Sequence, residues 1–152
     1  MAKPVVYLAG RISELTWEEA STWRTLAADL LGDSFQIRNP MRDKPELKTV
    51  GKLTGAYPEY LLCQAKAIVL RDLTDLDHAD AVLVYAPPGC HPGKATWMEI
   101  GYTVKSAKPI VLVADRFDDE LRTNPFLSAL PRLLIVGTLT EAAQVLRSLF
   151  NV

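Results

Sequence analysis

Glu99 is the residue whose type and position most favour chemistry in this chain. It lies in residues 93–102, which follow an apolar run at 81–85 and a turn-rich loop at 86–92. The pattern predicts a strand, a loop and the first turns of a helix. In open α/β sheets, ligands bind outside the carboxyl ends of strands, where such loops meet helices. Glu99 is therefore placed for acid–base or nucleophilic work.

A structural explanation exists for the same glutamate. Thr96 and Glu99 have the spacing of a capping box, in which a hydroxyl and a carboxylate bond the free backbone N–H groups at a helix start. Capping boxes are more common than catalytic glutamates. This segment alone therefore favours capping over catalysis.

Asp72 is a second candidate carboxylate. Pro58 suits the first position of a helix, and we predict a helix from about residue 58 to about residue 75. Asp72 then shares one stripe with apolar residues at spacings of four, three and four, namely Leu61, Ala65 and Ile68. A carboxylate on a buried stripe is costly unless it is hydrogen-bonded or binds a ligand. The alternatives are an ion pair with Arg71 or Lys66, or a helix end open to water.

Five short apolar runs separated by helical patterns predict the fold. The runs are residues 4–9, 35–37, 81–85, 110–113 and 133–136. Capping boxes mark two of the helix starts, at Thr16 with Glu19 and at Thr138 with Glu141, and Gly32 is placed to end the first helix. A short helical piece is expected at about 118–122. Strands that alternate with helices imply parallel pairing through right-handed crossovers.

We therefore predict an α/β fold, a flavodoxin-like doubly wound sheet of five parallel strands in the order 2-1-3-4-5 with helices on both faces. The first and third strands then lie side by side at the switch point. The crevice there is expected to collect four polar residues, Arg11, Ser13, Asp72 and Glu99. For Arg11 the alternative is a surface ion pair with Glu14 or Glu18.

Residues 39–56 are polar and contain Pro40, Pro45, Gly51 and Gly55, with basic residues scattered among them. They predict a long loop over the sheet edge. Such loops are often functional, and a functional lid and a solvated excursion remain equally open.

Composition limits the class of protein. A length of 152 residues is typical of one domain spanning 1–152, and the net charge of −1 argues against a nucleic-acid polymer as partner. Cys63 and Cys90 form no CxxC pattern, which indicates reduced thiols and a cytoplasmic protein. No apolar run approaches the roughly 20 residues that span a bilayer, and no signal-peptide core is visible.

Several known site types are missing from the sequence. It contains no dinucleotide-binding glycine fingerprint, no phosphate-binding P-loop and no serine nucleophile elbow. His78 and His91 are too isolated to predict a metal site, and no cofactor is expected. Two carboxylates, a tyrosine and an arginine in an α/β cleft suit glycosidic chemistry, in which one carboxylate attacks an oxocarbenium-like anomeric carbon.

The chain resembles the nucleoside 2-deoxyribosyltransferase family, which includes the related 2'-deoxynucleoside 5'-phosphate N-hydrolases. The matching pieces lie in order within residues 4–113, at 6–10, 71–73, 80–84, 98–102 and 108–113. The resemblance implies a retaining, metal-free mechanism. Glu99 would be the nucleophile that forms a deoxyribosyl-enzyme intermediate, Tyr7 would hold Glu99 by a hydrogen bond, and Asp72 would bind the sugar or help to protonate the leaving base.

The resemblance also implies a deoxynucleoside or deoxynucleotide substrate and a homo-oligomer in which a neighbour completes the pocket. The expected substrate-binding residues are Gly10, Arg11, Ser13, Gly93 and Lys94. Gly93 stands where the transferases carry an Asp and the N-hydrolases a Ser. We favour deoxyribosyl transfer between bases, with hydrolysis of 5'-monophosphates and a non-catalytic nucleotide-binding domain as the alternatives.

Overall fold

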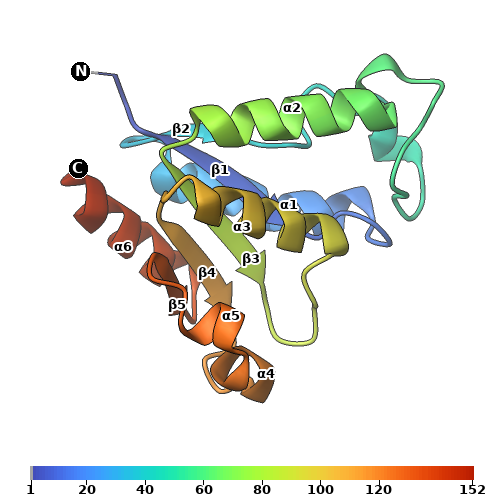
Figure 1. The fold of residues 1–152 in the computed structure, drawn as a ribbon. Helices are drawn as coiled ribbons and strands as arrows, with labels where there is room; N and C mark the ends of the chain where they lie inside the picture. Colours follow the sequence, from blue (N-terminus) through green and yellow to red (C-terminus); the bar gives the residue numbers. More distant parts are fainter. Residues whose placement is uncertain (1) are drawn as a thin grey trace.

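Strands and helices alternate along the chain in this computed structural model, which describes residues 2–152 (Figure 1). The strands are β1 (Val5–Gly10), β2 (Gln36–Arg38), β3 (Ala81–Ala86), β4 (Ile110–Ala114) and β5 (Leu133–Val136). The helices are α1 (Trp17–Leu31), α2 (Ala65–His78), α3 (Lys94–Lys105), α4 (Asp119–Thr123), α5 (Pro125–Ser128) and α6 (Leu139–Phe150). Two short 3-10 helices, η1 (Pro45–Thr49) and η2 (Leu61–Cys63), lie between β2 and α2.

The five strands form one parallel sheet in the order β2-β1-β3-β4-β5. This confirms the predicted α/β fold and its strand order. Within the sheet Leu8 lies opposite Leu83, and Leu83 lies opposite Val111. β1 and β3 are neighbours although the chain leaves β1 in the direction of β2, so their carboxyl ends form the switch point where this architecture binds ligands.

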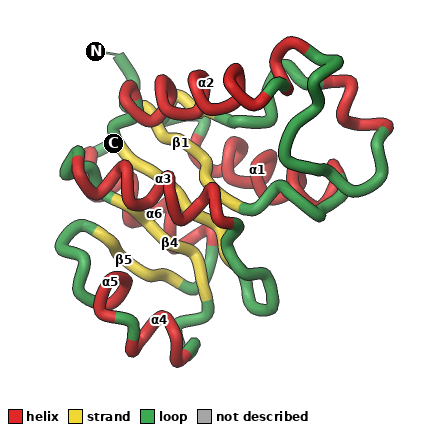
Figure 2. Tube along the Cα trace, turned by 45° about the vertical axis from the view of Figure 1, so that its right-hand side comes forward, coloured by secondary structure: helices red, strands yellow, loops and turns green. Residues whose placement is uncertain are grey.

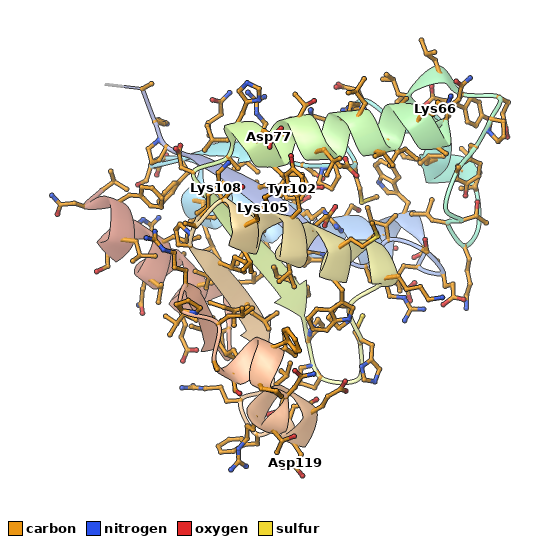
Figure 3. The ribbon with its side chains drawn as sticks, in the orientation of Figure 1. Lys66, Asp77, Tyr102, Lys105, Lys108 and Asp119 are labelled. Atoms are coloured by element: carbon orange, nitrogen blue, oxygen red, sulfur yellow. The ribbon has the colours of Figure 1, made fainter. Side chains whose placement is uncertain are left out.

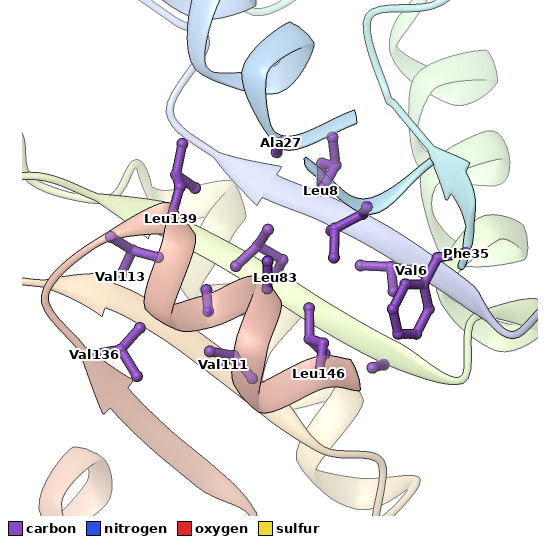
Figure 4. Close-up of a cluster of buried hydrophobic side chains, with 14 of the residues drawn as sticks. Val6, Leu8, Ala27, Phe35, Leu83, Val111, Val113, Val136, Leu139 and Leu146 are labelled. Carbon is purple, nitrogen blue, oxygen red and sulfur yellow. The ribbon is translucent and has the colours of Figure 1, made fainter. Parts of the chain in front are cut away.

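Both faces of the sheet are covered, which explains why the strands read as continuous apolar runs. α1 and α6 pack on one face, where Val6, Leu8 and Leu83 join residues of both helices in a core (Figure 4). α2 and α3 pack on the other face, against Tyr7, Val82 and other residues of the central strands. Alternate residues of β1 therefore serve the two layers, and Tyr7 faces α2 and α3.

Two helix starts confirm the predicted caps. At α1 the Thr16 hydroxyl accepts from the Glu19 N–H at 3.2 Å, and the Glu19 carboxylate accepts from the Thr16 N–H at 2.8 Å. Gly32 ends this helix, as its position predicts. At α6 the Thr138 hydroxyl accepts from the Glu141 N–H at 3.1 Å. The Glu141 carboxylate accepts from the Gly137 N–H at 2.7 Å instead of from Thr138, so this cap is only half of the predicted box.

The predicted start of α2 at Pro58 is wrong, because the helix begins at Ala65. The backbone of residues 57–63 instead closes a loop, in which the Tyr57 N–H donates to the Cys63 carbonyl at 2.8 Å. Leu61 is 75% exposed and belongs to η2, so it shares no buried stripe with Asp72. A proline at a helix start and a proline in a turn carry the same sequence signal.

The polar loop at 39–56 belongs to the long connection between β2 and α2, which Figure 2 draws as loop with short helical turns. Met41, Leu47 and Leu53 form a third buried cluster with Ala20 and Cys63. The Leu53 N–H donates to the Leu15 carbonyl at 2.7 Å, which ties this loop to the chain ahead of α1. The alternative prediction, that this loop is fully solvated, is therefore wrong, because three of its apolar side chains are buried and hold it beside the switch point.

The end of α2 is fixed to α3 and to the chain before β4. Figure 3 shows Asp77 beside Tyr102, whose hydroxyl donates to the Asp77 carboxylate at 2.7 Å. The Lys108 ammonium donates to the carbonyls of Leu76 and Asp77, both at 2.6 Å. These contacts set the position of α2 relative to α3.

Among the helices of residues 2–152, none has the length and apolar character that crossing a bilayer requires.

Candidate active site

Glu99 turns its carboxylate towards β1, where it meets Tyr7. The Tyr7 side chain is fully buried, and its hydroxyl donates to Glu99 Oε1 at 2.9 Å. The capping box predicted for Thr96 and Glu99 is wrong. α3 begins at Lys94 with Gly93 as its N-cap, so Thr96 and Glu99 lie inside the helix and are too far along it to cap its start.

Burial sets the charge state of this pair. It raises the pKa of Glu99 from 4.5 to about 7; the Tyr7 hydrogen bond opposes this rise, Asp72 adds to it, and Arg24 again opposes it. Burial and the charge of Glu99 also raise the pKa of Tyr7 well above its usual value. Tyr7 therefore stays a hydrogen-bond donor, while Glu99 changes its charge close to neutral pH.

Arg24 is a buried cation of this region that the sequence analysis missed. Its side chain is fully buried, donates to the carbonyls of Ala20 and, at 3.0 Å, of Gly10, and lies 4.4 Å from the centre of the Trp23 ring. Burial lowers the pKa of Arg24 to about 10, so the guanidinium remains charged. The signal was present in the sequence, because Arg24 follows Ala20 by four residues and shares the apolar stripe of α1.

Asp72 lies half-buried on α2 and lines the same cavity as Glu99. Burial raises its pKa from 3.8 to about 6; Lys44 opposes this rise and Asp75 adds to it. The proposed ion pair with Arg71 or Lys66 is absent from residues 2–152. Arg71 instead donates to the Arg42 carbonyl at 3.1 Å and to Asp43 at 3.5 Å, and Lys66 is exposed at the start of α2 (Figure 3).

A cavity of about 470 Å³ opens at the switch point. This volume falls in the range of small-molecule sites. Seven of the eight predicted site residues line it, namely Gly10, Arg11, Ser13, Asp72, Gly93, Lys94 and Glu99. The eighth, Tyr7, is buried behind Glu99 and reaches the cavity through its hydrogen bond.

Arg11 and Lys94 give one side of the cavity a positive character. Lys94 is the first residue of α3, whose first turn contains no acidic residue among the described positions. A β-carbon built on Gly93 would lie 3.7 Å from the Arg11 side chain, so this arginine is next to the helix start. Arg11 also donates to the Ser13 carbonyl at 3.0 Å and pairs with Glu14, as one sequence alternative expected.

Close packing explains why a glycine occupies position 10. A β-carbon at this position would lie 2.8 Å from the Trp23 ring and 3.2 Å from the Tyr85 carbonyl oxygen. Trp23 and Tyr85 stack at 4.8 Å between ring centres. Gly10 thus allows β1 to end beside two aromatic rings and still face the cavity.

Lys44 is the second residue that the sequence analysis missed. It belongs to the loop after β2, is 7% exposed and lines the cavity. Its burial depends on the packing of Met41 and Leu47 on either side of it, which a polar loop sequence does not reveal.

Within residues 2–152, no three His, Cys, Asp or Glu side chains gather as a metal site would need.

Comparisons with solved structures support the fold. A conserved protein from Enterococcus faecalis matches with a TM-score of 0.65 and 13% identity, over 97% of this chain and 99% of that one. A CMP N-glycosidase from Clostridium botulinum matches with a TM-score of 0.54 and 17% identity, over 95% and 98% of the two chains. A molybdenum cofactor binding protein from Rippkaea orientalis matches with a TM-score of 0.63 and 17% identity, over 99% of each chain.

Comparisons of sequence identify the family. No curated protein sequence matches the chain. The family model described as nucleoside 2-deoxyribosyltransferase like matches residues 3–117, which is most of the chain and includes β1, α2, α3 and every predicted site residue. The chain therefore belongs to the nucleoside 2-deoxyribosyltransferase-like family, a family of glycosyl transfer and hydrolysis.

Proposed function

We propose that this protein cleaves the N-glycosidic bond of 2'-deoxynucleosides and transfers the deoxyribosyl group to another base through a covalent intermediate on Glu99. The observation that carries the proposal is the Tyr7–Glu99 hydrogen bond of 2.9 Å at a cavity that Asp72 also lines. A retaining glycosidic reaction uses two carboxyl groups, one as nucleophile and one for proton transfer. The family membership supports the same chemistry.

Glu99 acts as the nucleophile in this proposal. Tyr7 holds Oε1, which leaves Oε2 to bond the anomeric carbon. As the C1'–O bond forms, the C1'–N bond breaks and its electron pair leaves with the base. The Asp72 carboxyl supplies a proton to the departing base. In the second half, a nitrogen of another base attacks C1', the ester bond to Glu99 breaks and Asp72 recovers the proton.

Hydrolysis of 2'-deoxynucleoside 5'-monophosphates is a second candidate function, with water replacing the incoming base. The observation that favours it is the positive side of the cavity. A helix N-terminus attracts anions. Lys94 occupies the first position of α3, where its positive charge is repelled by the positive end of the helix dipole, and a bound anion would remove that repulsion. Arg11 lies beside it, although Glu14 already pairs with this guanidinium.

One assay separates these reactions. The protein is incubated with each deoxynucleoside and each 5'-monophosphate, with and without a second free base, and the bases are separated by chromatography. Exchanged base that requires an acceptor supports transfer. Free base released chiefly from monophosphates supports hydrolysis. Release of no base from any substrate contradicts both reactions and leaves a non-catalytic nucleotide-binding domain.

Arg11→Ala sharpens the assay, with Arg122→Ala as the matched control. Both arginines pair with a carboxylate three residues away in sequence, but Arg122 lies on α4 with Asp119. For transfer to free nucleosides, both variants keep the wild-type kcat/KM. If a 5'-phosphate binds at this side, Arg11→Ala alone removes the preference for the monophosphate, by about ten- to a hundredfold in kcat/KM.

We also propose that the protein is a homo-oligomer in which a neighbour completes the cavity. Neighbouring helices α2 and α3 expose large apolar side chains, with Leu70 at 70% and Met98 at 76% exposure. Apolar surface of this kind commonly marks an interface. We expect Leu70→Glu to reduce the mass measured by light scattering and to lower activity. Leu149→Glu, at an exposed position on α6, is the control that changes neither.

A further inference from the structure

Lys44 is only 7% exposed, and its ammonium has no hydrogen bond and no ion pair within residues 2–152. The fully enclosed unpaired nitrogens of the described residues belong to arginines, so the Lys44 ammonium is open to the cavity that it lines. A charge on a largely buried side chain is normally paired. Burial lowers the pKa of Lys44, and the charge of Asp72 opposes that change. Lys44 lines the cavity, so a bound molecule can supply the missing partner.

The neighbouring cations Arg42 and Arg71 each donate hydrogen bonds, although Arg71 Nη1 is enclosed without a partner. Arg42 donates to both Asp75 oxygens, at 2.5 and 3.0 Å. Arg71 donates to the Arg42 carbonyl and to Asp43, at 3.1 and 3.5 Å. Asp72 is the carboxylate with the strongest electrostatic effect on Lys44, but the two groups form no ion pair. Lys44 and Asp72 thus present a donor and a carboxyl group to the same cavity.

Lys44 lies on the α2 side of the cavity. The titratable groups that affect it come from α2, from η2 and from the loop after β2, namely Asp72, Arg71, Cys63 and Arg42. Arg11 and Lys94, by contrast, come from the loop after β1 and from the start of α3. In the proposed function Asp72 gives its proton to the leaving base. The base therefore lies against Asp72 and within the surroundings of Lys44.

We propose that Lys44 binds the leaving base through an oxo group, and that the protein selects keto bases such as hypoxanthine, guanine, uracil and thymine over adenine and cytosine. This inference rests on the proposed N-glycosidic reaction. An ammonium group has three donors and no acceptor. It therefore favours a carbonyl oxygen and rejects the amino group that adenine and cytosine carry at the corresponding ring position.

The same contact would help the reaction itself. When the C1'–N bond breaks, the electron pair moves onto the base, and negative charge spreads to its carbonyl oxygen. A fixed cation at that oxygen is worth more in the transition state than in the ground state. Loss of Lys44 is therefore expected to reduce kcat as well as to raise KM for keto substrates.

The test is a comparison of Lys44→Met with Lys48→Met. Methionine keeps an unbranched chain and removes the charge, and Lys48 is an exposed lysine of the same loop. The substrates are deoxyinosine with deoxyadenosine, or deoxyuridine with deoxycytidine, whichever pair the wild type cleaves. We expect Lys44→Met to lower kcat/KM for the keto member by about ten- to a hundredfold, and for the amino member less than about threefold. Lys48→Met should leave both unchanged.

A second arm uses the 5'-monophosphates of the same pair, because a phosphate oxygen is also an acceptor. If Lys44→Met lowers kcat/KM for both bases equally and removes only a monophosphate preference, Lys44 binds phosphate and the inference is overturned. Unchanged keto selectivity in an active Lys44→Met variant overturns it as well and leaves the proposed reaction standing. Failure of the wild type to release base from any substrate overturns the reaction and, with it, this inference.

Discussion

Asp75 and Glu99 are two carboxylates on the same side of the sheet, and they differ in the groups that bind them. Asp75 is 6% exposed, and Arg42 binds both its oxygens while Arg38 lies 4.0 Å away. Glu99 is held by the neutral hydroxyl of Tyr7, and burial raises its pKa to about 7. Asp75 is therefore paired with cations, whereas Glu99 is held by a neutral hydroxyl and changes its charge close to neutral pH.

The contrast repeats within one helix. Asp72 and Asp75 lie three residues apart on α2, so they share one side of it. Asp75 is closed off by arginines of β2 and of the loop that follows it, while Asp72 lines the cavity. Burial therefore does not by itself identify a functional carboxylate. The distinguishing feature is burial without a cation bound to both oxygens, next to a space that admits a ligand.

The largest expected effect is loss of turnover in Glu99→Gln. Removing the nucleophile should lower kcat/KM by at least about a thousandfold. The Gln side chain can still accept from Tyr7, so the fold should persist. Circular dichroism and thermal melting check the fold, and near-normal turnover would assign the nucleophile elsewhere.

Glu99→Gln also tests the charge state through stability. Since the pKa of Glu99 is raised from 4.5 to about 7, the folded state favours the protonated form. The stability that protonated Glu99 contributes is fully present below about pH 4.5 and is lost as the pH rises through 7. The variant should match the wild type at pH 4 and exceed it at pH 8 by about 1 to 3 kcal/mol in the free energy of unfolding. Equal stabilities at pH 8 would contradict the raised pKa.

Asp75→Ala should give the largest loss of stability. It leaves the guanidinium of Arg42 partly buried without its carboxylate, and breaking such a pair costs about 3 to 5 kcal/mol. Urea unfolding measures the loss. Asp29→Ala, at an exposed position on α1, is the control and should change stability by less than about 0.5 kcal/mol. A mild effect at Asp75 would remove the contrast between the two carboxylates.

Asp72→Asn should act on turnover and spare the fold. Asn is nearly isosteric with Asp but cannot transfer a proton, so we expect kcat to fall by about a hundredfold. Thermal stability at pH 7 should be unchanged or higher, because burial disfavours the charged Asp72 carboxylate. Stopped-flow or steady-state kinetics with calorimetry separate the two readouts. Wild-type kinetics in this variant would remove Asp72 from the reaction.

The smallest expected effect is a shift of the pH profile in Tyr7→Phe. Glu99 must be ionised to attack and Asp72 must be protonated to donate, so kcat/KM of the wild type should be bell-shaped, with its maximum between about pH 6 and pH 7. The Tyr7 hydrogen bond favours the ionised form, so its removal raises the pKa of Glu99 further. The acidic limb of the profile should then move to higher pH, with roughly a tenfold loss below pH 7. An unmoved limb would mean that another group titrates there.

Sequence reasoning found the fold and most of the cavity because each depended on a local pattern. Apolar runs marked the strands, and the strand order gathered Arg11, Ser13, Asp72 and Glu99 at one crevice. The contact between Tyr7 and Glu99 was implied by the family resemblance. It failed where two explanations share one pattern. Thr96 has capping spacing inside a helix that starts two residues earlier, at Lys94, and Pro58 starts a turn instead of a helix.

The missed residues depend on packing between distant segments. Lys44 is buried because the loop after β2 packs around Met41, Leu47 and Leu53, and no local period encodes that contact. Arg24 lies on the apolar stripe of α1, so its burial was readable. Its place near Glu99, however, follows from the pairing of β1 with β3 and the position of α3.

The most direct test of the account is a search for the covalent intermediate. The protein is mixed with a deoxynucleoside in the absence of any acceptor base, quenched in acid within seconds and examined by intact-protein mass spectrometry and peptide mapping. The account predicts a mass increase of one deoxyribosyl unit, located on the peptide that contains Glu99 and absent from Glu99→Gln. Turnover of the deoxynucleoside with an adduct on another residue, or with no adduct at any quench time, would contradict it.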